Sequence, residues 1–94
     1  MPLSITEARK LLEEIPSWTL SADVKKLSKS YRFKDFAEAL AFTNKVGEIA
    51  ETEGHHPDIV LSWGKVDITL TTHAIGGLSV NDFILAAKVE KLVV

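Results

Sequence analysis

Apolar positions recur at helical spacing in three segments of the chain, and each segment opens with residues typical of a helix start. The opening pairs are Ser4 with Glu7, Asp35 with Glu38, and Ser79 with Asp82. In such a pair the first side chain accepts a hydrogen bond from a free backbone amide, and the acidic residue faces the positive helix end. The pattern predicts three helices, from about Ile5 to Ile15 before Pro16, from near Phe36 to a stop at Gly54, and roughly from Val80 to Leu92.

Two pairs of strands are predicted between these helices. The first pair is Trp18 to Leu20 and Lys25 to Phe33, joined through a turn at Ser21-Ala22-Asp23. The second pair is a hairpin with its turn at Gly64-Lys65, which places Ile59 opposite Leu70. The alternation predicts Trp63 on the buried side with Ile59 and Leu61, and His73 at the end of the last strand on the less apolar side.

The element order is helix, two strands, helix, two strands, helix. This order predicts an α+β fold, αββαββα, in which a four-stranded antiparallel sheet carries its three helices on one face. A chain of 94 residues has room for one core, so residues 1–94 are expected to form a single domain.

Composition narrows the function classes. The chain has no cysteine, so disulfides cannot reinforce so small a core, and self-association is expected instead. It lacks a long apolar run and a signal peptide, which predicts a cytoplasmic protein without a membrane partner. A net charge of −2 disfavours direct nucleic-acid binding. The local basic cluster is interpreted as the solvated face of a strand; it comprises Lys25, Lys26, Lys29, Arg32 and Lys34.

Three histidines are the candidate chemical groups. His55 and His56 follow the predicted end of the second helix, Pro57 keeps His56 extended, and His73 lies at the far end of the hairpin. The predicted pairing brings this loop near His73, and imidazoles exchange protons near neutral pH. From the residues alone, ordinary surface histidines are an equal alternative. A zinc site with an open position for water ranks lower, because adjacent histidines do not easily converge on one ion.

Two carboxylates accompany the histidines. Glu51 lies one helical turn before His55 and is suited to orienting a histidine or holding a substrate amine, although a solvated residue on the helix surface is the simpler interpretation. Asp82 has a structural role available, since it completes the helix cap begun by Ser79, and this role is favoured.

These residues together form a spaced motif. Glu51-Thr-Glu-Gly-His55-His56-Pro57, followed by Trp63, His73 and Asp82, resembles the signature of the pterin-4a-carbinolamine dehydratase family, with every position filled. Further likeness lies in Phe33-Lys-Asp-Phe36, in Val66-Asp-Ile-Thr-Leu-Thr-Thr-His73 and in Gly77-Leu-Ser, so the resemblance covers nearly the whole chain.

The resemblance implies dehydration of a 4a-hydroxytetrahydropterin to quinonoid dihydropterin, the recycling step after aromatic amino-acid hydroxylation, without metal or organic cofactor. It implies His55 and His73 as acid and base in an order left open, with His56 positioning the hydroxyl. Pro57 and Trp63 would be supporting residues. The residues implied to line the pterin pocket are Glu51, Gly54, Thr71, Thr72 and Ala74, and the strand end from Thr71 to Ala74 is implied to offer backbone groups to the amide-like edge of the pterin.

The chain departs from the family pattern at Gly54, Ala74 and Asn81, which affects expected affinity more than expected reaction type. Members of the family form dimers or dimers of dimers, so a homodimer or homotetramer is expected. The alternative function is a binding module, because some relatives are dimerisation partners of a homeodomain transcription factor and others assist enzyme assembly.

Overall fold

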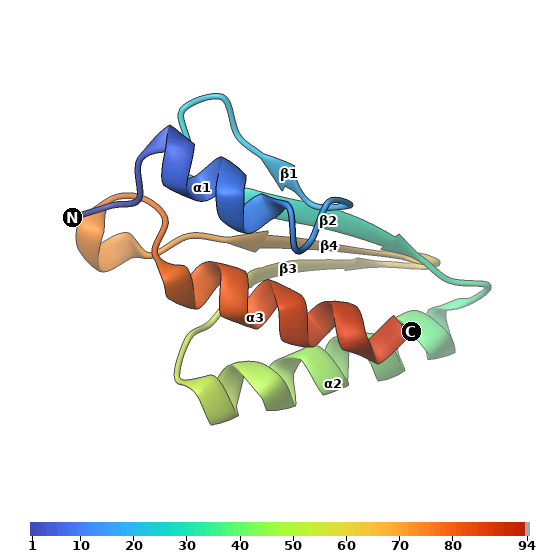
Figure 1. Cartoon of the computed structure of the whole chain (residues 1–94). Helices are drawn as coiled ribbons and strands as arrows, with labels where there is room; N and C mark the ends of the chain where they lie inside the picture. The colour runs from blue at the N-terminus through green and yellow to red at the C-terminus, as the bar shows by residue number, and fades with distance from the viewer. Residues whose placement is uncertain (94) are drawn as a thin grey trace.

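One layer of helices packs against one sheet in the computed structural model, which describes residues 1–93 (Figure 1). The elements in chain order are α1 (Ile5–Leu12), β1 (Thr19–Leu20), β2 (Leu27–Arg32), α2 (Phe36–Glu53), β3 (Asp58–Ser62), β4 (Lys65–Leu70), the 3-10 helix η1 (His73–Ile75), α3 (Val80–Glu90) and the 3-10 helix η2 (Lys91–Val93). The predicted α+β class and the αββαββα order are confirmed, with two short 3-10 helices added.

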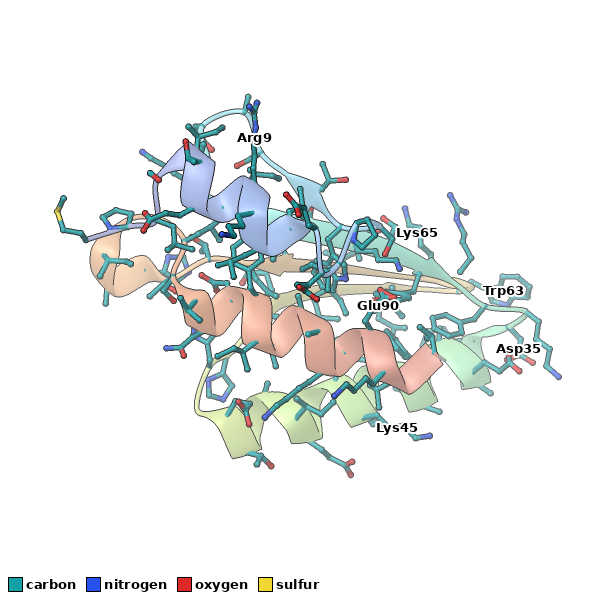
Figure 2. All side chains as sticks on the ribbon, viewed as in Figure 1. Arg9, Asp35, Lys45, Trp63, Lys65 and Glu90 are labelled. Carbon is teal, nitrogen blue, oxygen red and sulfur yellow. The ribbon has the colours of Figure 1, made fainter. Side chains whose placement is uncertain are left out.

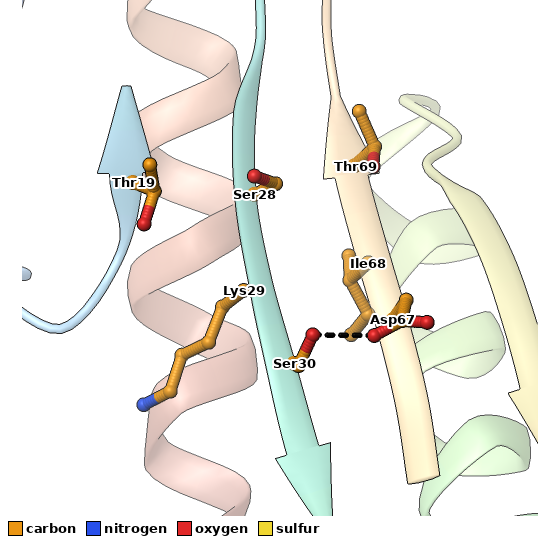
Figure 3. Close-up of a pocket in the computed structure, with 7 residues that line it drawn as sticks. All are labelled: Thr19, Ser28, Lys29, Ser30, Asp67, Ile68 and Thr69. Carbon is orange, nitrogen blue, oxygen red and sulfur yellow. Dashed lines mark hydrogen bonds between the residues drawn. The ribbon is translucent and has the colours of Figure 1, made fainter. Parts of the chain in front are cut away.

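The four strands form one antiparallel sheet in the order β1-β2-β4-β3. Side chains alternate across the sheet, so Val66, Ile68 and Leu70 of β4 are fully buried while Asp67 and Thr69 between them are partly exposed. The buried side faces α2 and α3, which lie behind the strands when the sheet is viewed from its open side (Figure 3). The hydrophobic core therefore lies between one sheet face and the helices.

The open face of the sheet is polar. It holds a shallow hollow of about 330 Å³, in which the Ser30 hydroxyl donates to Asp67 on the neighbouring strand (Figure 3). This bond lowers the pKa of the Asp67 carboxyl below its ordinary value. Apart from the exposed Val60 of β3, this face carries mainly hydroxyl and charged side chains, so the helices pack on the more apolar opposite face.

The predicted helix starts are confirmed, and the predicted ends differ in two helices. Ser4 and Glu7 form the reciprocal cap of α1, with bonds of 2.9 and 3.1 Å. The α-helix ends at Leu12, since Ile15 bonds back to Leu12 at a spacing of three residues ahead of Pro16. In the last helix the α-helical pattern ends at Glu90, and the final turn is the tighter η2.

The β3–β4 hairpin has a different turn from the one predicted. The turn is Trp63-Gly64, so Ile59 pairs with Ile68 and the expected pairing with Leu70 is wrong. Phe33 approaches the turn closely, and a Cβ on Gly64 would lie 2.9 Å from its carbonyl oxygen. Glycine is therefore needed in the turn itself.

Trp63 is not a core residue, and the expectation of burial is wrong. Its side chain is 69% exposed because the shifted turn removes it from the strand. Ile59 and Leu61 do pack against the core, as expected. Trp63 lies at the turn end of the hairpin (Figure 2). The strand register places His55, His56 and His73 beyond the other end, where Asp58 pairs with Thr69.

The basic cluster is also divided between two faces. Lys29 shares the helix-facing side of β2 with Tyr31, so its interpretation as part of a solvated face is wrong, whereas the other four members are exposed. Glu90 at the end of α3 accepts hydrogen bonds from Lys29 at 2.5 and 2.9 Å, Tyr31 at 2.7 Å and Trp18 at 3.1 Å. Burial by itself raises the pKa of Glu90, but the bonds from Lys29 and Tyr31 hold it below its ordinary value.

The longest helix, α2, is 18 residues long and has an outer side that carries exposed Lys45, Glu48 and Glu51. None of the helices described within residues 1–93 combines the length and apolar character that spanning a bilayer requires.

Candidate active site

A glycine stop at the end of α2 places the adjacent histidines. Gly54 adopts the left-handed conformation, with a φ of 65°, and its amide bonds to carbonyls in the last turn of α2. The His55 amide bonds to the carbonyl of Ala50 at 3.2 Å, which completes the cap. Pro57 then keeps the chain extended into β3. Gly54 thus has a clear conformational role, in addition to the pocket-lining role expected for it.

His55 is anchored to a buried carboxylate. Its Nε2 lies 2.5 Å from Oδ1 of Asp82 in the first turn of α3. The His55 side chain is 17% exposed, whereas that of Asp82 is fully buried. An ionised carboxylate only accepts hydrogen bonds, so in a neutral His55 ring this contact favours the tautomer with its proton on Nε2 and a lone pair on Nδ1.

Asp82 combines the predicted cap with this second contact. Its Oδ2 accepts from the Ser79 amide at 3.0 Å and from the Thr72 hydroxyl at 2.7 Å. Three donors and the positive end of α3 stabilise the buried negative charge. The sequence indicates the cap through the spacing of Ser79 and Asp82, but it gives no sign that the same carboxylate reaches His55.

His56 points to the other carboxylate of the motif. Its Nε2 contacts Oε2 of Glu51, which is consistent with the expectation that Glu51 orients a histidine. Both side chains are exposed, His56 at 61% and Glu51 at 78%. Ion pairs at such exposure contribute little to stability, so this contact sets orientation more than fold.

His73 lies beyond the last strand, not within it. β4 ends at Leu70, Thr72 caps η1, and His73 is the first residue of η1 with an exposed side chain. Ala74 follows it in the same turn. Thr71 is held by its hydroxyl, which donates to the Lys25 carbonyl at 2.6 Å. The Thr72 amide bonds to the Gly77 carbonyl at 2.8 Å, so the segment 71–77 is closed by an internal bond and tied to Lys25 by the Thr71 hydroxyl.

Hydrogen bonds connect part of the predicted site. Asp82 joins His55 on one side to Thr72 on the other, and Thr72 directly precedes His73. Glu51 and His56 form a neighbouring pair one residue from His55. Trp63 is the exception, because it belongs to the opposite end of the hairpin. The hydroxyl of Thr72 is the group that the sequence did not indicate, since only its backbone was expected to contribute.

The zinc alternative lacks a ligand set in the part of the chain that the structure describes. Within residues 1–93, no three histidine, cysteine, aspartate or glutamate side chains are gathered as a metal site requires. Two of the three histidines instead direct a ring nitrogen to separate carboxylates. The arrangement is suited to proton transfer, because each of these carboxylates fixes the ring that it contacts.

The chain is similar to known proteins over nearly its whole length. Residues 1–92 match the family model described as pterin 4 alpha carbinolamine dehydratase. Two relatives that share the name "Putative pterin-4-alpha-carbinolamine dehydratase" are each 52% identical to it. The one from Saccharophagus degradans aligns over 94% of this chain and 80% of its own length. The one from Methylococcus capsulatus aligns over 97% of this chain and 80% of its own length.

Solved structures share the fold. A transcriptional coactivator/pterin dehydratase from Brucella melitensis superposes with a TM-score of 0.90 at 28% identity, covering 97% of both chains. A pterin dehydratase-like protein identified as a RuBisCO assembly factor in the alpha-carboxysome gives a TM-score of 0.69 at 27% identity, covering 81% of this chain and 88% of the other.

Proposed function

Because this chain belongs to the pterin 4 alpha carbinolamine dehydratase family, we propose that it removes water from a 4a-hydroxytetrahydropterin to give quinonoid dihydropterin. The observation that carries the proposal is His55, whose Nε2 is held by the buried carboxylate of Asp82 while the two other histidines of the motif are also present. A buried carboxylate that contacts a partly exposed imidazole is an arrangement found in sites of proton transfer.

The reaction is an elimination across one carbon–nitrogen bond. The ring nitrogen beside the carbinol carbon loses its proton, the carbon–oxygen bond breaks, and a carbon–nitrogen double bond forms between the two ring atoms. The departing hydroxyl takes up a proton and leaves as water. One group must therefore accept a proton and another must donate one, and positioned imidazoles serve both purposes near neutral pH.

We assign the base to His55. With its proton on Nε2 against Asp82, the lone pair of Nδ1 is free to accept the proton of the ring nitrogen. Asp82 then stabilises the imidazolium that forms, as a buried carboxylate does in hydrolase triads. This assignment goes one step beyond the motif, because it distinguishes His55 from the other two rings.

The acid role goes to His73, and His56 positions the hydroxyl. The ring of His73 is exposed at the start of η1, beside the residue that contacts Asp82, so it is accessible to a bound ligand. Glu51 orients His56 through its Nε2. The backbone of Thr71, together with that of Thr72 and Ala74, is proposed to pair with the amide-like edge of the pterin, with Gly54 lining the pocket.

The test is a stopped assay with chemically generated 4a-hydroxytetrahydropterin, comparing the parent with His55→Ala, His56→Ala and His73→Ala. Loss of a general acid or base costs about 10²–10⁴-fold, so His55→Ala and His73→Ala are expected to show the largest losses. Circular dichroism checks that each variant is folded. A parent rate equal to the uncatalysed rate contradicts the proposal.

A binding module is the second candidate. One structural neighbour is named as a transcriptional coactivator/pterin dehydratase and the other as a pterin dehydratase-like RuBisCO assembly factor. This chain has an apolar groove of about 270 Å³ lined by residues 11–15 and by α3. Val80 and Ile84 on its rim are 49% and 41% exposed. If the parent rate equals the uncatalysed rate while the fold is intact, this function is favoured.

We further propose a cytoplasmic homodimer or homotetramer in a pathway with an aromatic amino-acid hydroxylase. The support is the small size of the chain and the absence of cysteine, since such domains are commonly stabilised by association. Sedimentation equilibrium of the purified chain separates monomer, dimer and tetramer by mass.

A further inference from the structure

Two hydroxyl groups behind the histidines form an ordered chain of hydrogen bonds. The Thr72 hydroxyl lies 2.8 Å from that of Ser79 and 2.7 Å from Oδ2 of Asp82. Thr72 has one hydroxyl hydrogen, and the carboxylate only accepts, so that hydrogen points to Asp82. Ser79 must then donate to Thr72. The direction of donation is fixed as Ser79 to Thr72 to Asp82.

This chain restrains the rotation of the Asp82 carboxylate. The Thr72 hydroxyl and the Ser79 amide both donate to Oδ2, which leaves Oδ1 for His55. Turning the carboxylate away from His55 breaks two bonds to a fully buried group, where an unpaired donor is costly. The side chain that fixes His55 is thus itself held in place.

Thr72 also belongs to the segment that carries the third histidine. The Thr72 amide bonds to the Gly77 carbonyl at 2.8 Å, and Thr72 is the N-terminal cap of η1, which begins at His73. One residue therefore contacts the carboxylate that orients His55 and directly precedes His73 in the same hydrogen-bonded segment. The structure contains no second residue with both connections within the hydrogen bonds described for residues 1–93.

We propose that Thr72 is a positioning residue for catalysis, whose hydroxyl, supported by Ser79, keeps Asp82 aligned so that the His55 proton stays on Nε2. The proposal rests on the proposed function of His55 as the base. This positioning role belongs to the Thr72 side chain, whereas the resemblance implied a contribution from its backbone. The proposal therefore predicts that removing the hydroxyl lowers activity even when the packing volume of the side chain is kept.

The experiment compares Thr72→Val, Thr72→Ser and Ser79→Ala with the parent. Valine keeps the shape and removes the hydroxyl, and loss of a hydrogen bond to a charged group corresponds to about a 10–100-fold change in rate when it acts on the transition state. We expect kcat of Thr72→Val to fall by about that factor with KM nearly unchanged, because the base and not ligand contact is affected. Serine restores the hydroxyl and is expected to recover most of kcat.

Nitrogen NMR of histidine-labelled protein gives a readout that packing changes do not produce. The parent is expected to show His55 protonated at Nε2, and Thr72→Val a mixture of both tautomers. Thr69→Val is the matched control, since Thr69 lies on the open sheet face and the same atoms change. It is expected to leave both kcat and the tautomer as in the parent.

The outcomes separate this proposal from the function itself. The tautomer is measured without substrate, so a parent without dehydratase activity contradicts the proposed function while the NMR comparison still tests the positioning role. An unchanged tautomer in Thr72→Val, or Thr72→Ser no more active than Thr72→Val, overturns the proposal. If Thr72→Val does not fold, Ser79→Ala decides, and an unchanged tautomer and kcat in that variant overturn it.

Discussion

Replacing Asp82 with asparagine is expected to remove most of the activity while preserving most of the stability. The carbonyl oxygen of the amide can still accept from Thr72 and from the Ser79 amide, which share Oδ2 in the parent. The amide NH₂ then faces Nε2 of His55, where Oδ1 lies now. Two donors cannot face one another, so Nε2 must give up its hydrogen and the proton moves to Nδ1. The nitrogen proposed as the base is then blocked.

The size of both effects follows from the contacts. A misplaced imidazole proton removes general base catalysis, which corresponds to about 10²–10⁴ in kcat. The variant keeps its three hydrogen bonds but loses their charged acceptor, a difference of about 1–2 kcal/mol in the free energy of unfolding. For a domain of this size, 1 kcal/mol lowers Tm by about 4–8 °C. Asp82→Ala leaves buried donors unpaired and is expected to cost about 3–5 kcal/mol instead.

The assay combines the stopped rate measurement with thermal unfolding and nitrogen NMR of His55. We expect Asp82→Asn to be folded, to have a moderately lowered Tm, to have lost most of its kcat, and to show His55 protonated at Nδ1. A folded Asp82→Asn that retains more than about a third of the parent kcat refutes the assigned role of Asp82. General base catalysis near the parent rate is incompatible with a His55 ring whose Nδ1 carries the proton.

Three further predictions concern stability. Gly64→Ala places a methyl group 2.9 Å from the Phe33 carbonyl oxygen and is expected to lower the free energy of unfolding by about 1–3 kcal/mol in chemical denaturation. Gly47→Ala, whose new methyl group has no atom within 4 Å, is expected to raise it by about 0.5–1 kcal/mol. Because the pKa of Glu90 is lowered in the folded state, its negative charge stabilises the fold at pH values above its ordinary pKa of about 4.5. The difference in free energy of unfolding between the parent and Glu90→Gln is therefore expected to decrease as the pH falls below about 4.5. Trp63→Ser is expected to change the unfolding free energy by less than about 0.5 kcal/mol and to leave kcat unchanged, and a larger loss would indicate a buried role.

Local patterns in the amino-acid sequence predict the secondary-structure elements and their order. Helix caps such as Ser4 with Glu7, the stop at Gly54 and the alternation along β4 are local signals, since each depends on residues a few positions apart. The histidine motif is likewise a pattern of residue types at fixed separations, which is why the amino-acid sequence alone carries the resemblance to the family. The predicted turn, Gly64-Lys65, lies one residue later in the chain than the observed turn, Trp63-Gly64. Gly64 belongs to both turns, and its close contact with Phe33 depends on a neighbouring segment that the local pattern does not show.

How the motif residues contact one another depends on the packing of distant segments. His55 and Asp82 are 27 residues apart, and Asp82 reaches the imidazole because α3 packs beside α2 on the same sheet face. The Thr72 hydroxyl joins them for the same reason, since the end of β4 lies against the first turn of α3. Strand alternation places Lys29 on the helix-facing side of β2, but only the packing of α3 supplies Glu90 as the partner for its charge. A local pattern specifies which groups a segment presents, whereas the partner of each buried polar group depends on packing between segments distant in the chain.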